Sequence, residues 1–213
     1  MMYRIEKVLN HNTVMAIHQD DHKEVLIMGK GVGFGRKVAE RIEVRPEDRL
    51  YSLQKYKERG GAKEIVKSIA PEFLEVTNAV LDEAEKIFGK IDRMVLFPLA
   101  DHIAFAVKRI QNHEQISNPL TEDIRVLFHM EFKAAESIRP LLQKQFGIDI
   151  EDDEVGYVAL HIHSAIEDEK VSQAMQMARS VRECISMVEE AIGKPIDIAS
   201  LSYNRPVSYT HLR

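Results

Sequence analysis

Residues 25–35 read VLIMGKGVGFG, four apolar residues followed by a glycine at every second position. A short apolar run of this kind is typical of a β-strand. Alternating glycines in a β setting let another backbone approach closely, because they carry no side chain. The stretch therefore predicts a strand over 24–28 and a further β-type run over 29–35.

Two more β-type runs precede this stretch, at 3–9 and 13–18. Asn and Asp residues lie between the runs, at 10–12 and 20–21, and these residue types tolerate the backbone of tight turns. The first 55 residues thus predict a small antiparallel all-β domain of four short strands. Four such strands cannot bury both faces of a sheet by themselves, so we expect this domain to form a homodimer.

The glycine run does not match the phosphate-binding motifs of nucleotide enzymes. A dinucleotide fingerprint that includes Gly31 needs a glycine where Arg36 stands, and the Gly-Lys-Ser/Thr ending of a P-loop is missing. Phe34 instead has cations near it, Lys30 and Lys37 among them. An exposed aromatic ring with flanking cations is what recognition of unstacked RNA bases requires. The alternative from spacing alone is a bulge with a core phenylalanine.

A second candidate is Asn10-His11-Asn12, which follows Lys7. Side-chain amides both donate and accept hydrogen bonds, so they can read base edges and sugar hydroxyls. A plain turn is the alternative interpretation of the same residues.

A linker is predicted over 56–62 from polar residues and two glycines, and the apolar period becomes helical after it. The expected helices follow one apolar stripe over 65–88 and then cover 92–111, 122–146, 151–165 and 171–192. Gly147 and Gly193 are placed as their C-terminal stops. The fold class is multi-domain, a small antiparallel all-β domain followed by an all-α helical bundle over 63–169. Residues 170–213 resemble the opening of another unit.

Two histidine-bearing stretches stand out in the helical part, Asp101-His102 and His161-Ile162-His163. Residues 161 and 163 fall on opposite helix faces, so they cannot grip one metal ion. Asp101 can orient a neighbouring imidazole. No carboxylate pair or Ser-His-Asp order supports hydrolysis, so we expect no catalytic residue, no metal and no cofactor. Half-buried structural histidines are the alternative for His102 and His161.

The composition is that of a soluble globular protein, with 213 residues, 45% apolar and 30% charged, and a net charge of −5. The charge is uneven, since residues 1–55 hold ten Lys/Arg against eight Asp/Glu. The single Cys184 excludes an internal disulfide and fits a reducing cytoplasm. No apolar run approaches the ~20 residues of a membrane helix. We therefore expect a cytoplasmic protein without membrane insertion.

Four motifs together carry a family resemblance. They are KVLNHN at 7–12, VLIMGKGVGF at 25–34, DHIAFA at 101–106 and EVGYVALHIH at 154–163. In this order they resemble the BglG/SacY-type transcriptional antiterminators, and most closely their glucose-responsive, GlcT-like branch. The resemblance implies a co-antiterminator (CAT) RNA-binding domain over 1–55 and a first phosphotransferase-regulated domain (PRD1) over 63–169.

The resemblance also implies what the residues do. The homodimeric head would bind a hairpin in the leader of a sugar-utilisation transcript and block an overlapping terminator. The residues implied to contact RNA are Lys7, Asn10, Asn12, Gly29, Lys30, Gly31 and Phe34. His102 and His161 are implied to be phosphorylated by phosphotransferase-system proteins, a sugar-specific transporter component or the phosphocarrier protein, with Asp101 accompanying His102. Negative control through this domain is the expected coupling.

The C-terminal part departs from the family. Residues 170–213 are expected to be the truncated start of a second regulatory domain, and 206–213, PVSYTHLR, resemble translated adapter sequence rather than native protein. His211 is therefore given no role.

Two other function classes compete with the antiterminator. A PRD-containing DNA-binding transcription activator is disfavoured because the first 60 residues hold no helix-turn-helix pattern. A small metal- or phosphate-handling enzyme is disfavoured by the missing carboxylates.

Overall fold

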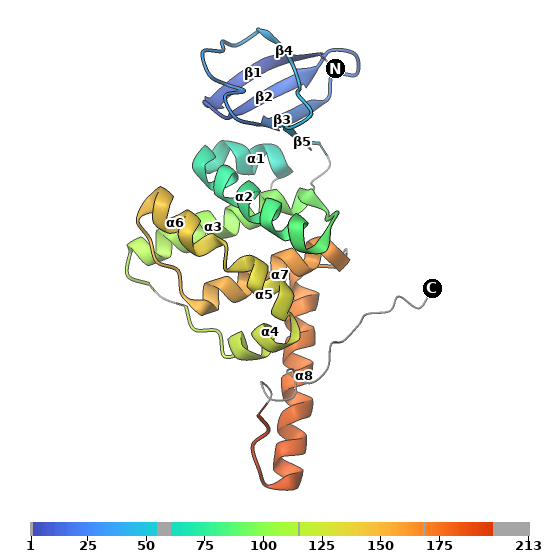
Figure 1. Ribbon diagram of the computed structural model, residues 1–213, viewed down its shortest axis with the longest axis vertical. Helices are drawn as coiled ribbons and strands as arrows, with labels where there is room; N and C mark the ends of the chain where they lie inside the picture. The colour runs from blue at the N-terminus through green and yellow to red at the C-terminus, as the bar shows by residue number, and fades with distance from the viewer. Residues whose placement is uncertain (1, 55–60, 115, 168, 198–213) are drawn as a thin grey trace.

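The computed structural model describes residues 2–54, 61–114, 116–167 and 169–197. A β-sheet lies at one end of the molecule, helices pack beneath it, and one long helix extends away from the opposite end (Figure 1). Most of the predicted linker and the whole of the 206–213 tail lie outside the described residues.

The sheet has five antiparallel strands, where the sequence predicted four. They are β1 (Met2–Asn10), β2 (Thr13–His18), β3 (Glu24–Met28), β4 (Arg41–Glu43) and β5 (Arg49–Ser52), in the order β4-β1-β2-β3-β5. The first three strands are confirmed. The expected β-type run over 29–35 is wrong, because these residues form consecutive turns. Gly31 and Gly35 have φ of 72° and 67°, values that leave the pleated conformation.

The two faces of the sheet are buried in different ways, as the alternation of side chains along a strand allows. One face forms a small core of its own, made of Tyr3, Ile5, Val14, Ala16, Val25, Ile27, Val32 and Ile42. The other face joins the helical core through Met15, Leu26, Met28, Tyr51 and Leu53. Both faces are thus covered within one chain, so burial alone does not require a partner, and the homodimer stays a prediction.

The helical region holds more and shorter elements than the sequence pattern indicated. They are α1 (Gly61–Ser68), α2 (Pro71–Phe88), the 3-10 helix η1 (Arg93–Val95), α3 (Leu96–Gln111), α4 (Thr121–Leu127), α5 (His129–Ala135), α6 (Ile138–Phe146), α7 (Asp152–Glu167) and α8 (Val171–Ile192). The apolar stripe over 65–88 belongs to two helices, α1 and α2, and not to one. The chain leaves the helical path before Pro71, which occupies the first turn of α2. The expected helix over 122–146 is three helices, interrupted first at Phe128, whose φ and ψ of −116° and 45° are not helical.

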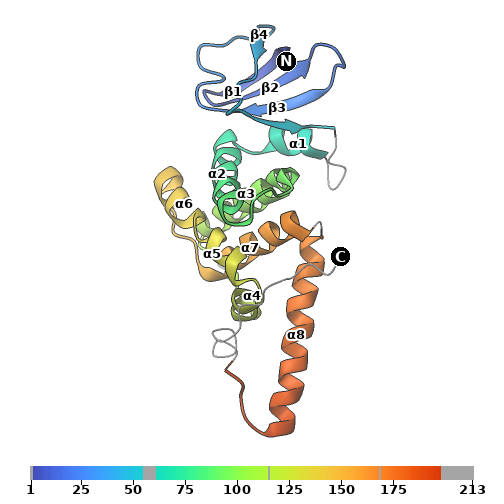
Figure 2. The ribbon, with the colours of Figure 1, turned by 45° about the vertical axis from the view of Figure 1, so that its right-hand side comes forward.

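The predicted helix ends are confirmed at Gly147 and Gly193, which both adopt the left-handed conformation with φ of 66°. Helix α7 is largely buried and contacts α4, α5, α8 and η1. Helix α8 buries only Ala174 and Ala178 and extends past the bundle (Figure 2). No helix among the described residues is long and apolar enough to cross a membrane.

Candidate nucleic-acid interface and histidine pocket

The turn at 10–12 and the loop at 29–35 pack together at one end of the sheet, which we call the loop end. Gly29 donates its backbone N–H to the carbonyl oxygen of Asn12, and Gly33 donates to that of His11, both at 2.9 Å. The N–H of Gly31 donates to Asn12 Oδ1, also at 2.9 Å. Three backbone donors of the glycine loop are therefore tied to the turn.

Gly33 shows why this loop needs glycine. A Cβ atom at Gly33 would lie 2.2 Å from the carbonyl oxygen of Asn10, and one at Gly29 would lie 1.9 Å from Asp48 Oδ1. At Gly33 the neighbour is backbone, which cannot move aside easily. The prediction that alternate glycines admit another backbone is therefore confirmed at this position.

Phe34 is 69% exposed, so it is not a core phenylalanine. Its ring centroid lies 5.4 Å from that of His11, edge to face. The two rings form an aromatic pair at the tip of the loop end, available for stacking. Sequence reasoning includes His11 only within the 10–12 turn and does not pair it with Phe34, because the two residues come from different segments and no spacing rule links them.

The two asparagines of the turn have structural partners. Asn10 Oδ1 accepts a hydrogen bond from the Asn12 backbone N–H at 2.9 Å, which shapes the turn. Asn10 Nδ2 donates to Glu75 Oε1 of α2 at 2.8 Å. The interpretation of 10–12 as a turn is therefore confirmed, and the same turn places Asn10 and Asn12 at the loop end.

Positive charge lies at and near the loop end. Lys30 is exposed, and its carbonyl oxygen accepts a hydrogen bond of 2.8 Å from Arg45. Arg45 is held in turn by the buried carboxylate of Asp48, at 2.7 Å. Lys7 is exposed on β1, where it pairs with Met15 in register, and precedes the turn. The structure thus brings six of the predicted RNA residues together, with Lys7 further along the strand.

The second candidate site lies between α3 and α7. His102 of α3 and His161 of α7 have ring centroids 5.5 Å apart, and Tyr157 lies at the same distance from His102. These residues, with Asp101, line a cavity of about 910 Å³. We call this cavity the histidine pocket. The sequence motifs identify both histidines as candidate site residues, but they do not predict that the two side chains lie close together.

The two imidazoles differ in burial and charge. The His161 side chain is 8% exposed, and its burial, helped by the nearby His102, lowers its pKa to about 3. His161 is therefore neutral at physiological pH. His163 faces elsewhere, as predicted, with Nδ1 3.0 Å from Glu131 Oε1.

The carboxylate beside His102 belongs to Glu154, not to Asp101. His102 Nε2 lies 3.3 Å from Glu154 Oε2, and the same buried carboxylate pairs with Arg109. Asp101 is exposed at the pocket. Sequence reasoning includes Glu154 only as the first residue of the 154–163 motif and gives it no partner, although its spacing of seven from His161 places both residues on one helix face.

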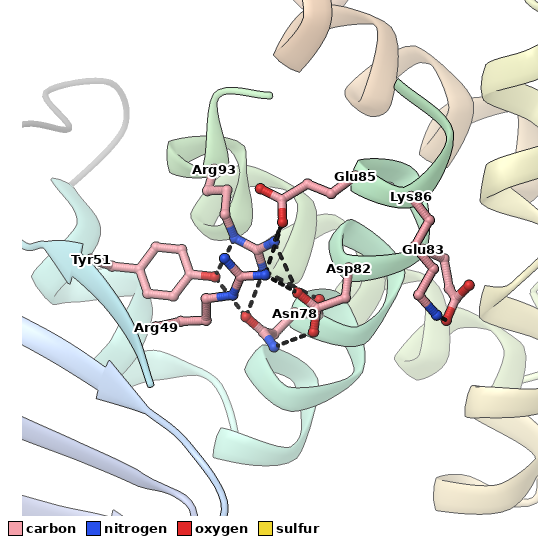
Figure 3. Close-up of polar contacts among 8 residues, drawn as sticks. All are labelled: Arg49, Tyr51, Asn78, Asp82, Glu83, Glu85, Lys86 and Arg93. Carbon is pink, nitrogen blue, oxygen red and sulfur yellow. Dashed lines mark hydrogen bonds and ion pairs between the residues drawn. The ribbon is translucent and has the colours of Figure 1, made fainter. Parts of the chain in front are cut away.

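A polar cluster joins the sheet to the helices, and we call it the sheet–helix junction (Figure 3). Arg93 of η1 pairs with Asp82 at 3.0 Å and Glu85 at 2.8 Å. Its Nε donates to the Tyr51 hydroxyl at 3.1 Å, and that hydroxyl donates to Asn78 Oδ1 at 2.6 Å. Burial raises the pKa of Tyr51, so its hydroxyl keeps its proton.

The junction also includes Arg49 of β5, which contacts Asp82 at 3.1 Å and Glu85 at 2.9 Å. Because η1 leads directly into α3, Arg93 connects the sheet to the helix that carries His102.

Comparison with known proteins assigns both regions. The CAT RNA binding domain model matches residues 3–60, and the PRD domain model matches 76–165. The GlcA/glcB genes antiterminator of Staphylococcus carnosus (strain TM300) is 30% identical over 95% of this chain and 71% of its own length. The chain belongs to the BglG/SacY family of RNA-binding transcriptional antiterminators.

Other antiterminators agree with this assignment. The β-glucoside operon antiterminator of Dickeya chrysanthemi is 25% identical over 99% of this chain and 74% of its own length. The crystal structure of GlcT CAT-PRDI matches with a TM-score of 0.67 and 30% identity, covering 78% of this chain and 99% of that one. The loop end lies within the CAT match, and the histidine pocket lies mostly within the PRD match.

Proposed function

We propose that the loop end binds a hairpin in the leader of a sugar-utilisation transcript, so that an overlapping terminator does not form. The exposed Phe34 ring, carried on a glycine loop that is docked onto the 10–12 turn, is the observation that supports this most. It offers a stacking face for an unpaired base, while Lys7 and Lys30 attract phosphates and the asparagine amides meet base edges. The protein acts by binding, without catalysis, as a homodimer in the cytoplasm.

We further propose that His102 and His161 accept phosphate from phosphotransferase-system proteins, the sugar-specific transporter component or the phosphocarrier protein. A phosphoryl group adds roughly −1.5 to −2 charges by analogy with other phosphorylated side chains. In the histidine pocket this charge would lie close to the buried Glu154 carboxylate, which favours an altered packing of α3 on α7. Asp101 lines the pocket from its exposed side.

The RNA proposal is tested by gel shift with a leader-RNA hairpin and the equivalent DNA duplex. We expect the hairpin to be bound and the duplex not, and Phe34→Ala to weaken hairpin binding by roughly five- to 150-fold, since stacking is worth about 1–3 kcal/mol per base. Val38→Ala is the matched control, because Val38 is also exposed in the CAT domain at 62%. Binding of the duplex in preference to the hairpin would favour the DNA-binding activator instead.

The phosphorylation proposal is tested with His102→Asp and His161→Asp, which place a negative charge in the histidine pocket. We expect both changes to alter dimerisation in analytical ultracentrifugation and to alter RNA affinity. Unchanged dimerisation and unchanged affinity in both variants would disprove the coupling.

A further inference from the structure

One side of the regulatory helix α2 faces the loop end and carries mostly negative charge. Helix α2 holds five carboxylates and one lysine. Glu75, Asn78, Asp82 and Glu85 recur at spacings of three and four, and we call them the acidic face of α2. A cleft of about 610 Å³ is lined on one side by Asn12, Gly29 and Lys30 and on the other by Glu75, Asn78 and Asp82. The loop end and the acidic face therefore share one cleft.

Glu75 forms a hydrogen bond with the Asn10 side-chain amide, which is one of the groups proposed to bind RNA. Asn10 Nδ2 donates to Glu75 Oε1 at 2.8 Å, while Asn10 Oδ1 is engaged by the Asn12 backbone. Both ends of the Asn10 amide are thus occupied within the chain. A base edge or sugar hydroxyl that binds Asn10 through this N–H must displace the Glu75 carboxylate.

The charge of Glu75 is not neutralised as those of its neighbours are. Asp82 and Glu85 each pair with both Arg49 and Arg93 (Figure 3). Of the described residues, no lysine or arginine pairs with Glu75, whose partner is the neutral Asn10 amide. Its negative charge therefore faces the cleft, where an incoming RNA phosphate would be repelled.

We propose that Glu75 of the regulatory domain competes with RNA for Asn10, so that the acidic face of α2 is an intramolecular binding partner of the loop end. This inference rests on the proposed RNA binding. The sheet and α2 do not have to separate for RNA to bind, because turning the Glu75 side chain away breaks its hydrogen bond to Asn10 and leaves the apolar core shared by the sheet and the helices in place. Any change that moves α2 relative to the sheet would strengthen or weaken the competition.

Two substitutions of Glu75 test the competition in the full chain by fluorescence anisotropy with a labelled leader-RNA hairpin. Glu75→Ala removes both the charge and the acceptor, and we expect tighter binding by about three- to tenfold, the range of one ordinary hydrogen bond. Glu75→Gln keeps an acceptor and removes the charge, so its gain should be smaller. That gain should shrink further at high salt, because screening already weakens the repulsion.

Glu83→Gln is the matched control. Glu83 lies on the same helix and pairs with Lys86 at 2.6 Å, away from the sheet–helix junction (Figure 3). It removes one negative charge from α2 without touching Asn10, and we expect unchanged affinity. If Glu83→Gln raised the RNA affinity as much as Glu75→Gln does, the gain would come from the net charge of α2 and not from the contact with Asn10. That result would overturn the proposal.

Asn10→Ala separates failure of the inference from failure of the proposed function. We expect this change to weaken RNA binding and to reduce the gain from Glu75→Ala, since no amide is left to release. If the wild-type chain binds the hairpin through Asn10 but Glu75→Ala binds no tighter, the competition is disproved and the function stands. If the wild-type chain does not bind the hairpin at all, the proposed function fails, and the inference with it.

Discussion

The loop end exposes Phe34 and Lys30 on a loop held by backbone hydrogen bonds, whereas the histidine pocket buries His161 and the neighbouring Glu154 between two helices. Phe34 is 69% exposed on a loop tied to a turn, while His161 is 8% exposed and Glu154 4%. An exposed site of this kind is sensitive to backbone geometry and to competition for its polar groups. A buried pocket is sensitive to charge, because low exposure leaves little water to screen it.

The sharpest way to break the loop end is to add one methyl group at Gly33. In Gly33→Ala the new Cβ would meet the Asn10 carbonyl oxygen, so the loop must leave the turn, and we expect RNA affinity to fall roughly a hundredfold, about 2.7 kcal/mol. Gel shift measures the loss. Gly35→Ala is the control, because no atom lies within 4 Å of its added Cβ and only its φ of +67° opposes the change. Equal losses in both variants would contradict the backbone argument.

The junction between the two regions depends on Arg93. Arg93→Ala leaves Asp82 and Glu85 with Arg49 as the cation that still pairs with both, and it removes the donor to the Tyr51 hydroxyl. We expect the free energy of unfolding to fall by about 2 kcal/mol, measured by urea denaturation. Arg93→Lys should recover part of this loss, since it restores the charge without the planar donors. A full recovery would show that the hydrogen-bond geometry is unimportant.

The histidine pocket should make stability depend on pH through His161. Its pKa is lowered to about 3 in the folded chain, so the unfolded chain binds a proton first, near pH 6.5. We therefore expect the contribution of His161 to the free energy of unfolding to be greatest above pH 6.5 and to be lost as the pH falls toward 3. The fall at pH 5.5 should be about 1.4 kcal/mol, measured by thermal unfolding.

His161→Gln should flatten this pH dependence. His22→Gln is the matched control, because His22 is exposed in a turn of the sheet and should leave the slope unchanged. A wild-type slope that persists in His161→Gln would assign the pH dependence to other groups.

The smallest expected effect belongs to His11, which the structure places beside Phe34. His11→Ala removes one ring of the aromatic pair, and we expect RNA affinity to fall about fivefold, the low end of the range for base stacking. His11→Phe should retain most of the affinity, because it keeps a ring at that position. If His11→Phe binds as weakly as His11→Ala, the ring itself does not contribute.

Much of both regions could be predicted from local patterns. The first three strands, the ends of the helices at Gly147 and Gly193, and the opposite orientations of His161 and His163 follow from residue type and period. The four motifs are sufficient to indicate the family, and the candidate RNA residues lie together except for Lys7.

The remainder depends on contacts between distant segments, which no local pattern records. The short strands β4 and β5 carry few apolar residues and exist because they pair with β1 and β3. The partner of His102 is Glu154 from another helix rather than its neighbour Asp101. Likewise, the burial of the second sheet face by α1 and α2 could not be foreseen from the strands alone.

The shared core of sheet and helices sets an order of events during synthesis. The face that carries Met15, Leu26 and Tyr51 is complete once β5 has left the ribosome at Ser52, but α2 is complete only at Phe88. At typical rates of roughly 5–20 residues per second, that apolar face stays uncovered for about 2–7 seconds. During this interval a neighbouring nascent chain presents the same uncovered face. Two sheets that paired through this face would have to do so before α2 covers it, within the time that the ribosome takes to add residues 53–88.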